Sequence, residues 1–213
     1  MVIVLIYLMN LGKKVPYMLE VEAKVAIDKT EDHVEMASSA KNMLDKIKGL
    51  GGEDFREVEQ WDLYLEHPCR DFKKLDEAFR IRAERRPDDE EWEIKMTYKG
   101  PKLSDLSKAR VEREIDLQRG TQIQDVQDML SSIGLEVAGE VKKTRWFLQL
   151  GEFHIFIDQV EGLGSYIEVE IMSVDLQGAE KKILEFLDDL GLEKRERMSY
   201  MELLKGENLD FEE

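Results

Sequence analysis

The strongest constraint on the fold is a segment in which charged and apolar residues alternate strictly. In Leu19–Val25 (LEVEAKV), every second residue is charged and the residues between them are apolar. Successive side chains of a strand point to opposite faces, so this segment predicts a β-strand with one charged and one apolar face. A mirrored segment, Tyr166–Ile171 (YIEVEI), lies near the other end of the chain. Together the two segments predict a cluster of four carboxylates, the ligands that hard metal ions prefer: Glu20, Glu22, Glu168 and Glu170.

The same alternation recurs in several other segments. Arg80 and Arg82 lie two residues apart, as do Lys143 and Arg145, so each pair shares one face of a predicted strand. A single charged face usually points to solvent, and this alternative stays open for any one segment. Its repetition along the chain favours a shared, enclosed role instead. The charged residues in phase within their strands are Glu20, Glu22, Lys24, Arg80, Arg82, Lys95, Lys99, Arg110, Glu112, Glu114, Lys143, Arg145, Asp158, Glu168 and Glu170.

Apolar residues recur at helical spacing in the segments 34–47, 126–133 and 179–190, and each predicts an amphipathic helix. The helices and the apolar strand faces must cover one another, so the simplest arrangement turns the charged strand faces inward around a water-filled tunnel. Most connections between the predicted strands are hairpins. We therefore predict an α+β fold, an eight-stranded antiparallel β-barrel (a tunnel) with a charged interior and amphipathic helices packed on its outside.

The length of 213 residues suits one principal domain, which we place at residues 18–205, followed by an acidic tail at 206–213. Residues 1–17 form an N-terminal extension that begins with the apolar run Met1–Leu11. This run is shorter than the ~20 residues that span a bilayer, and no basic region precedes it as in a signal peptide. Two interpretations remain: an apolar arm or extra strand, or a natural start at Met18, which we favour.

The formal net charge of −16 disfavours nucleic acid and anionic membranes as partners. The single cysteine, Cys69, excludes an internal disulfide and favours a reducing, cytoplasmic location. The sequence is compatible with a homodimer. Local positive charge still allows an anionic ligand, because lysine and arginine bind phosphate oxygens while carboxylates hold Mg²⁺ or Mn²⁺. A tunnel lined by both signs of charge therefore predicts a metal-bound phosphate ligand.

The motif Glu20-x-Glu22-x-Lys24 resembles the signature of the CYTH superfamily, the triphosphate tunnel metalloenzymes. Supporting matches follow in order along the chain: Gln60-x-Asp62-x-Tyr64, Arg80-x-Arg82, Lys99-Gly100-Pro101, Arg110-x-Glu112, Lys143-x-Arg145, Asp158 with Gly162-Leu163-Gly164, and Glu168-x-Glu170. The resemblance implies a triphosphate substrate and Mg²⁺ or Mn²⁺, with Asp158 as a further metal ligand or proton acceptor beside the four glutamates. Lys24 and Asp158 are the implied catalytic residues. The implied phosphate clamp consists of Lys24, Arg80, Arg82, Lys95, Lys99, Arg110, Lys143 and Arg145.

Within this superfamily, the stretch from Lys143 to Met172 is most similar to the class IV adenylyl cyclases. The resemblance thus implies conversion of ATP to cyclic AMP and diphosphate. One departure is Glu170, which completes a Glu-x-Glu that the hydrolases of the superfamily usually carry and the cyclases can lack. An inorganic, thiamine or nucleoside triphosphatase therefore stays as an alternative, and so does a non-catalytic module that binds triphosphate or polyphosphate.

Overall fold

The structure is a computed structural model that describes residues 19–102, 110–192 and 194–206. The predictions for the apolar run Met1–Leu11 and for nearly all of the acidic tail lie outside the described residues.

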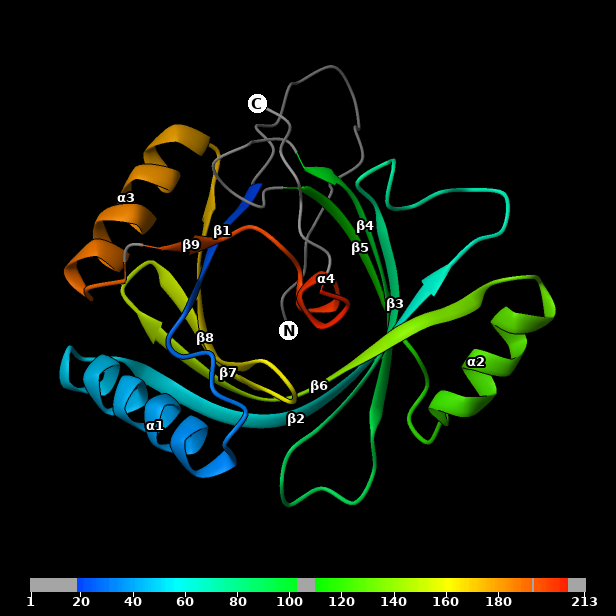
Figure 1. Ribbon diagram of the computed structural model, residues 1–213, viewed down its shortest axis with the longest axis horizontal. Helices are drawn as coiled ribbons and strands as arrows, with labels where there is room; N and C mark the ends of the chain where they lie inside the picture. Colours follow the sequence, from blue (N-terminus) through cyan, green and yellow to red (C-terminus); the bar gives the residue numbers. More distant parts are fainter. Residues whose placement is uncertain (1–18, 103–109, 193, 207–213) are drawn as a thin grey trace.

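One antiparallel sheet forms the body of the molecule and curls into a half-barrel (Figure 1). Its spatial order is β5-β4-β3-β2-β6-β7-β8-β1-β9. The strands are β1 (Leu19–Ala26), β2 (Glu53–Glu66), β3 (Ala78–Arg85), β4 (Glu93–Lys102), β5 (Arg110–Asp116), β6 (Glu136–Leu150), β7 (Phe153–Val160), β8 (Gly164–Ser173) and β9 (Arg195–Glu196). The antiparallel α+β prediction is confirmed.

The predicted closed, eight-stranded barrel is wrong in strand number and in closure. The sheet has nine strands, and in the part of the chain that the structure describes no ladder joins β5 to β9. The physical reason lies at β1, whose second edge pairs with the short strand β9 through Lys24↔Glu196 and Val25↔Arg195. Since β9 occupies part of the edge of β1 that β5 would need for closure, the curled sheet stays open as a half-barrel.

Three helices cover the outer, apolar face of the sheet (Figure 1): α1 (His33–Gly49), α2 (Ile123–Ser132) and α3 (Leu176–Asp189). Helices α1 and α3 pack over β1, β7 and β8, where Ile47 and Ile183 are buried among the valines and isoleucines of the strands. Helix α2 packs over β3 and β6, and its Leu130 belongs to a second cluster that includes Ile81 of β3. Among the described residues, no helix combines the length and apolar character needed to cross a membrane. The prediction that apolar faces turn outward is confirmed.

The register of β1 against β8 brings the two ends of the chain together. Glu22 lies opposite Glu170, and Lys24 lies opposite Glu168. The mirrored Glu-x-Glu segments are therefore adjacent strands, and their charged faces point to the concave side of the sheet.

A short fourth helix, α4 (Tyr200–Leu204), lies over the concave side (Figure 1). A capping box starts it, in which Ser199 and Glu202 each bond the other's backbone amide. Tyr200 is buried with Val141, Val160 and Tyr166. The C-terminal segment thus covers part of the half-barrel that the sheet leaves open.

Candidate active site

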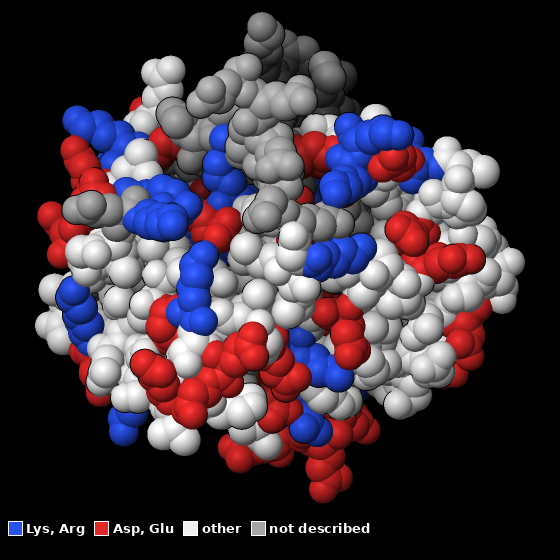
Figure 2. Space-filling model, in the orientation of Figure 1, with Lys and Arg blue, Asp and Glu red and all other residues white. Residues whose placement is uncertain are grey.

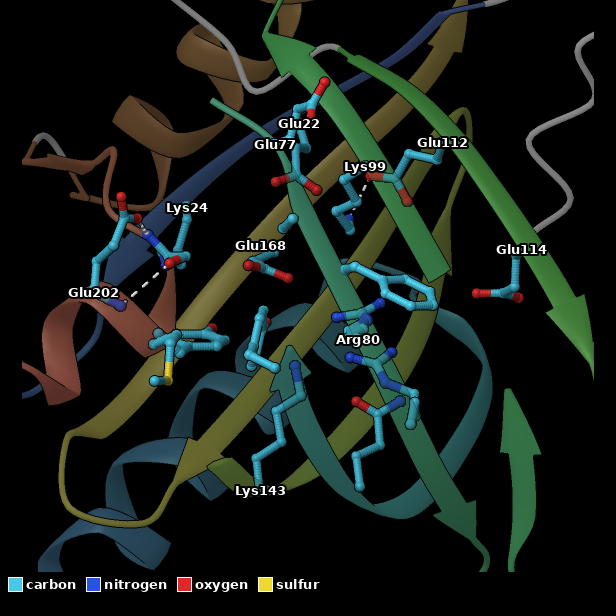
Figure 3. A pocket seen from close by; sticks show the side chains of 18 of the residues that line it. Glu22, Lys24, Glu77, Arg80, Lys99, Glu112, Glu114, Lys143, Glu168 and Glu202 are labelled. Atoms are coloured by element: carbon cyan, nitrogen blue, oxygen red, sulfur yellow. Dashed lines mark hydrogen bonds and ion pairs between the residues drawn. The ribbon is translucent and has the colours of Figure 1, made fainter. Parts of the chain in front are cut away.

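The concave side of the sheet holds an elongated pocket of about 500 Å³. All predicted site residues whose side chains are described line it, except Asp158. Arg110 begins β5, but its side chain lies outside the described ones. Figure 3 shows acidic and basic side chains from opposite walls pointing into the same space, among them Glu22, Lys24, Arg80 and Lys99.

The charge of the pocket differs from that of the outer surface. Figure 2 shows acidic side chains gathered along the lower part of one face of the molecule. The exposed acidic residues include the run Asp88–Glu91 between β3 and β4. The net negative charge of the chain is therefore compatible with a pocket rich in lysine and arginine.

A buried aspartate, Asp62, holds both arginines of β3. Its two oxygens accept hydrogen bonds from Nε and Nη2 of Arg82 at 2.6 and 2.7 Å, and Arg80 Nη1 lies 3.4 Å from one of them. Burial alone would raise the pKa of Asp62, but the attraction of Arg82 and Arg80 outweighs it and holds the pKa well below its usual range. The Nε of Arg80 is buried without a hydrogen-bond partner, so this arginine keeps a donor for a ligand.

A second buried aspartate, Asp158, is enclosed by cations. It accepts hydrogen bonds from Arg145, from Lys143 at 3.2 Å and from the hydroxyl of Tyr200 at 2.8 Å, and it has no exposed surface. Burial opposes ionisation, yet Arg145 and Lys143 keep the pKa of Asp158 below its usual value. This arrangement favours a positioning role for Asp158 over the predicted role as metal ligand or proton acceptor, because cations and a hydroxyl already surround its oxygens.

The same network changes the cations themselves. Burial, together with the nearby charge of Arg145, lowers the pKa of Lys143 to about 8, although Asp158 opposes this shift. Arg145 also pairs with Glu168. Burial raises the pKa of Tyr200 well above its usual value, and the charges of Asp158 and Glu168 raise it further, so its hydroxyl stays a donor.

The opposite wall is built by β4 and β5. Lys99 forms an ion pair with Glu112 (Figure 3), and Lys95 lies 3.7 Å from Glu114 and from Asp116. Burial would lower the pKa of Lys99, but Glu112 raises it above its usual value, so the ammonium is retained. Both predicted clamp lysines therefore face the pocket as charged groups held by acidic neighbours.

Lys24 is covered by the C-terminal segment. Its Nζ donates a hydrogen bond to the carbonyl of Met198 and lies 4.0 Å from the ring centroid of Tyr200. Only 1% of Lys24 is exposed. The predicted phosphate lysine thus lines the pocket beneath the segment that leads into α4.

The carboxylates of β1 and β8 have the donor chemistry of a cation site. Oε2 of Glu20 and Oε1 of Glu170 are buried without hydrogen-bond partners, and the latter lies 3.8 Å from Nδ1 of His154. Burial raises the pKa of both glutamates, and repulsion from Glu170 and Glu112 adds to the shift at Glu20. Among the described residues, no three acidic or histidine side chains converge as a preformed ligand set. The two unpartnered oxygens nevertheless fit a divalent cation, with Glu22 and Glu168 on the same wall.

Several residues at or next to the pocket have no predicted site role. Asp62 holds the arginines of β3, and the hydroxyl of Tyr200 donates a hydrogen bond to Asp158. Glu112 forms an ion pair with Lys99. Arg56 and Phe147 also line the pocket. Arg56 is in phase with Gln60 along β2, but the charged residues around it follow no strict alternation.

Comparison with known proteins agrees with this geometry. A match to the CYTH domain covers residues 18–200. A Methanocaldococcus jannaschii protein, named "Putative adenylate cyclase MJ0240", is 32% identical over 191 residues, which cover 87% of this chain and 98% of that protein. Among solved structures, the PH1819 protein of Pyrococcus horikoshii is 34% identical with a TM-score of 0.75, covering 89% of this chain and 99% of that one. The PH1012 protein of the same organism is 26% identical with a TM-score of 0.68, covering 87% and 99%.

A curled antiparallel sheet around a pocket lined by both acidic and basic side chains is typical of the tunnel class of triphosphate-binding proteins. The chain belongs to the CYTH family, as its sequence motifs predicted. Proteins of this class bind triphosphates and depend on metal ions.

Replacing Asp158 tests whether it holds the cations in place. Asp158→Asn leaves Lys143 and Arg145 buried without a full counter-charge, so we expect the free energy of unfolding to fall by about 3 kcal/mol in urea denaturation. The matched control is Asp116→Asn, whose side chain is 70% exposed and pairs with Lys95. This control is expected to lose less than about 1 kcal/mol. Equal losses in the two variants would contradict the positioning role.

Replacing Glu170 tests the cation site without an activity assay. Burial opposes the ionisation of Glu170 more than the nearby His154 favours it, so we expect Glu170→Gln to raise the free energy of unfolding of the metal-free protein by about 1 kcal/mol. We also expect Mn²⁺ to raise the melting temperature of the wild type and to raise that of the variant far less. The exposed Glu161→Gln serves as control. A variant that keeps the full Mn²⁺ effect would exclude Glu170 as a ligand.

Proposed function

We propose that this protein is a metal-dependent enzyme that acts on a nucleoside triphosphate and converts ATP to cyclic AMP and diphosphate. The observation that carries the proposal is the pairing of opposite chemistries in one pocket. Carboxylate oxygens without hydrogen-bond partners on Glu20 and Glu170 lie in the same pocket as Arg80, whose Nε has no hydrogen-bond partner either. A metal-bound triphosphate supplies what both lack, since its oxygens accept from the arginine while its cation binds the carboxylates. The similarity to the M. jannaschii protein supports the choice of the cyclase reaction.

The proposed roles follow from the contacts of each side chain. Arg80 and Arg82 bind and orient phosphate oxygens, because Asp62 holds both guanidinium groups toward the pocket. Lys143 and Arg145 of β6 bind the triphosphate, and Asp158 holds both of these side chains in place. Lys24, Lys95 and Lys99 add positive charge from β1 and β4. In the class described by these motifs, such a clamp lowers the barrier by stabilising the charge that develops on the phosphates.

We propose that Glu20, Glu22, Glu168 and Glu170 hold the cation, Mg²⁺ or Mn²⁺. When bound, such a cation acts as a Lewis acid on the phosphoryl group. In the cyclase reaction the 3′-hydroxyl of ATP gives up its proton to solvent and its oxygen attacks the α-phosphorus. The bond from the α-phosphorus to the oxygen that bridges to the β-phosphate breaks, and diphosphate leaves. Asp62 and Asp158 act through the cations that they position.

A triphosphatase is the second candidate. In that reaction water attacks the terminal phosphorus and orthophosphate leaves. The observation that favours it is the complete Glu168-x-Glu170 pair, because Glu170 carries an oxygen without a hydrogen-bond partner in the pocket. The same clamp and cation serve either reaction, so the products distinguish the two.

The deciding experiment incubates the protein with ATP and Mg²⁺ or Mn²⁺ and separates the products by chromatography. We expect cyclic AMP and diphosphate in equal amounts, lost by about a hundredfold or more in Glu22→Ala and in Glu168→Ala. Glu161→Ala controls for the loss of an exposed carboxylate, and circular dichroism checks that each variant is folded. Orthophosphate in place of cyclic AMP would establish the triphosphatase. Tight binding of ATP with no product in either metal would identify a binding module, and full activity in both variants would exclude the carboxylate site.

A further inference from the structure

One part of the pocket wall places an arginine over an aromatic ring. The guanidinium carbon of Arg56 lies 4.2 Å from the ring centroid of Phe147, which is stacking distance. Phe147 in turn meets Phe156 edge to face, with ring centroids 5.1 Å apart and an interplanar angle of 84°. All three side chains line the pocket. They come from β2, β6 and β7, and Phe147 lies opposite both Arg56 and Phe156 in the sheet register.

Arg56 differs from the other pocket arginines in its partners. Arg80 and Arg82 share the carboxylate of Asp62, and Arg145 binds Asp158. Within the described residues, Arg56 forms a contact with the face of Phe147 and no ion pair or hydrogen bond. Its guanidinium group therefore lies over a ring rather than against a carboxylate.

Gln60 adds a hydrogen-bond acceptor to the same face of β2. Its Nε2 donates to Oε2 of Glu84 at 2.5 Å. Since a carboxylate only accepts, this orientation of the amide leaves Oε1 as the free atom. That oxygen is buried without a partner, and Gln60 is only 2% exposed. Burial would raise the pKa of Glu84, but the charge of Arg82 and the hydrogen bond from Gln60 lower it, so Glu84 stays an acceptor for Gln60.

We propose that this part of the pocket, formed by Arg56, Phe147 and Gln60, binds the planar organic group of the substrate, a nucleobase that carries an exocyclic amine. The base stacks against the Arg56–Phe147 surface, and its amine donates to Oε1 of Gln60. The assignment rests on the proposed function, since it places the organic end of a triphosphate whose phosphates lie on the arginines of β3 and β6.

The chemistry of these groups distinguishes a base from a phosphate. Phosphate oxygens are acceptors, so they satisfy neither the ring face of Phe147 nor the acceptor oxygen of Gln60. A base offers a flat π-face and an N–H donor, and both arginine and phenylalanine stack on such faces. The subsite therefore predicts a preference for a nucleoside triphosphate over inorganic tripolyphosphate.

The test measures dissociation constants of ATP and of tripolyphosphate by isothermal titration calorimetry in the presence of Mg²⁺. Phe147→Leu keeps an apolar side chain but removes the aromatic face, so we expect ATP to bind about tenfold more weakly. Arg56→Lys keeps the charge but removes the planar group, and we expect about a threefold loss for ATP. Tripolyphosphate should stay within about twofold of the wild type in both variants, because it has no base.

Two matched controls make the same chemical changes away from the pocket. Phe153→Leu alters a ring of β7 that stacks on Phe186 beneath α3. Arg85→Lys alters an arginine 4.5 Å from the Trp92 ring, paired with Glu59. Both should bind the two ligands as the wild type does, and melting temperatures show whether each variant is folded.

The outcomes separate this inference from the proposed function. Equal weakening of both ligands in the variants would assign these side chains to the phosphates and overturn the base subsite. Unchanged ATP binding in both variants, with tripolyphosphate still bound, would also overturn the subsite while leaving triphosphate binding intact. A wild-type protein that binds neither ligand would overturn the subsite and the proposed function together.

Discussion

The structure depends on how buried positive charge is compensated inside the half-barrel. A concave sheet face that carries several lysines and arginines is costly to enclose, because each unpaired buried charge loses its hydration. Asp62 and Asp158 solve this problem for β3 and β6, each holding two cations from the neighbouring strand. Glu112 does the same for Lys99 across β4 and β5. The cations therefore stay charged and fixed in place before any ligand arrives, which is the condition for electrostatic preorganisation.

Most charged groups of the pocket are paired, so the buried atoms without hydrogen-bond partners indicate which ligand the pocket binds. Buried polar groups are nearly always hydrogen-bonded, so the exceptions require an explanation. Among the described residues, the exceptions that line the pocket are the Glu20 and Glu170 oxygens, the Arg80 Nε and the Gln60 Oε1. Two are carboxylate acceptors, one is a cationic donor and one is a neutral acceptor. A cation, a phosphate oxygen and an amine supply their complements, and a nucleotide with its metal ion carries all three.

Much of this arrangement could be predicted from the sequence, because the period-two alternation is a local property. It placed Glu22, Arg82 and Glu168 on the inner face correctly, as the pocket lining confirms. The outward apolar faces followed from the helices that must cover them. The alternation does not distinguish the inner from the outer face where both faces carry charged residues. Glu53–Glu59 is such a stretch, so the sequence did not identify Arg56 as a pocket residue.

Other features depend on contacts between distant parts of the chain. The two residues of β9 are too few to show a period, yet their pairing with β1 gives the sheet its ninth strand. The phase of Asp158 along β7 was predictable, but the Tyr200 hydroxyl that binds it lies 42 residues further along the chain. Tertiary packing decides which ionised groups pair with one another, and no local sequence pattern encodes these pairs.

We propose that a metal-bound nucleoside triphosphate occupies the concave pocket, with its cation on the carboxylates of β1 and β8. A crystal structure with Mn²⁺ and a non-reactive ATP analogue tests this placement directly, because an anomalous difference map locates the manganese. The account predicts a manganese peak at about 2.0–2.2 Å from oxygens of Glu20 and Glu170, as is usual for small divalent cations, with phosphate oxygens on Arg80. A manganese peak remote from these glutamates, or an analogue bound outside the pocket, would contradict it.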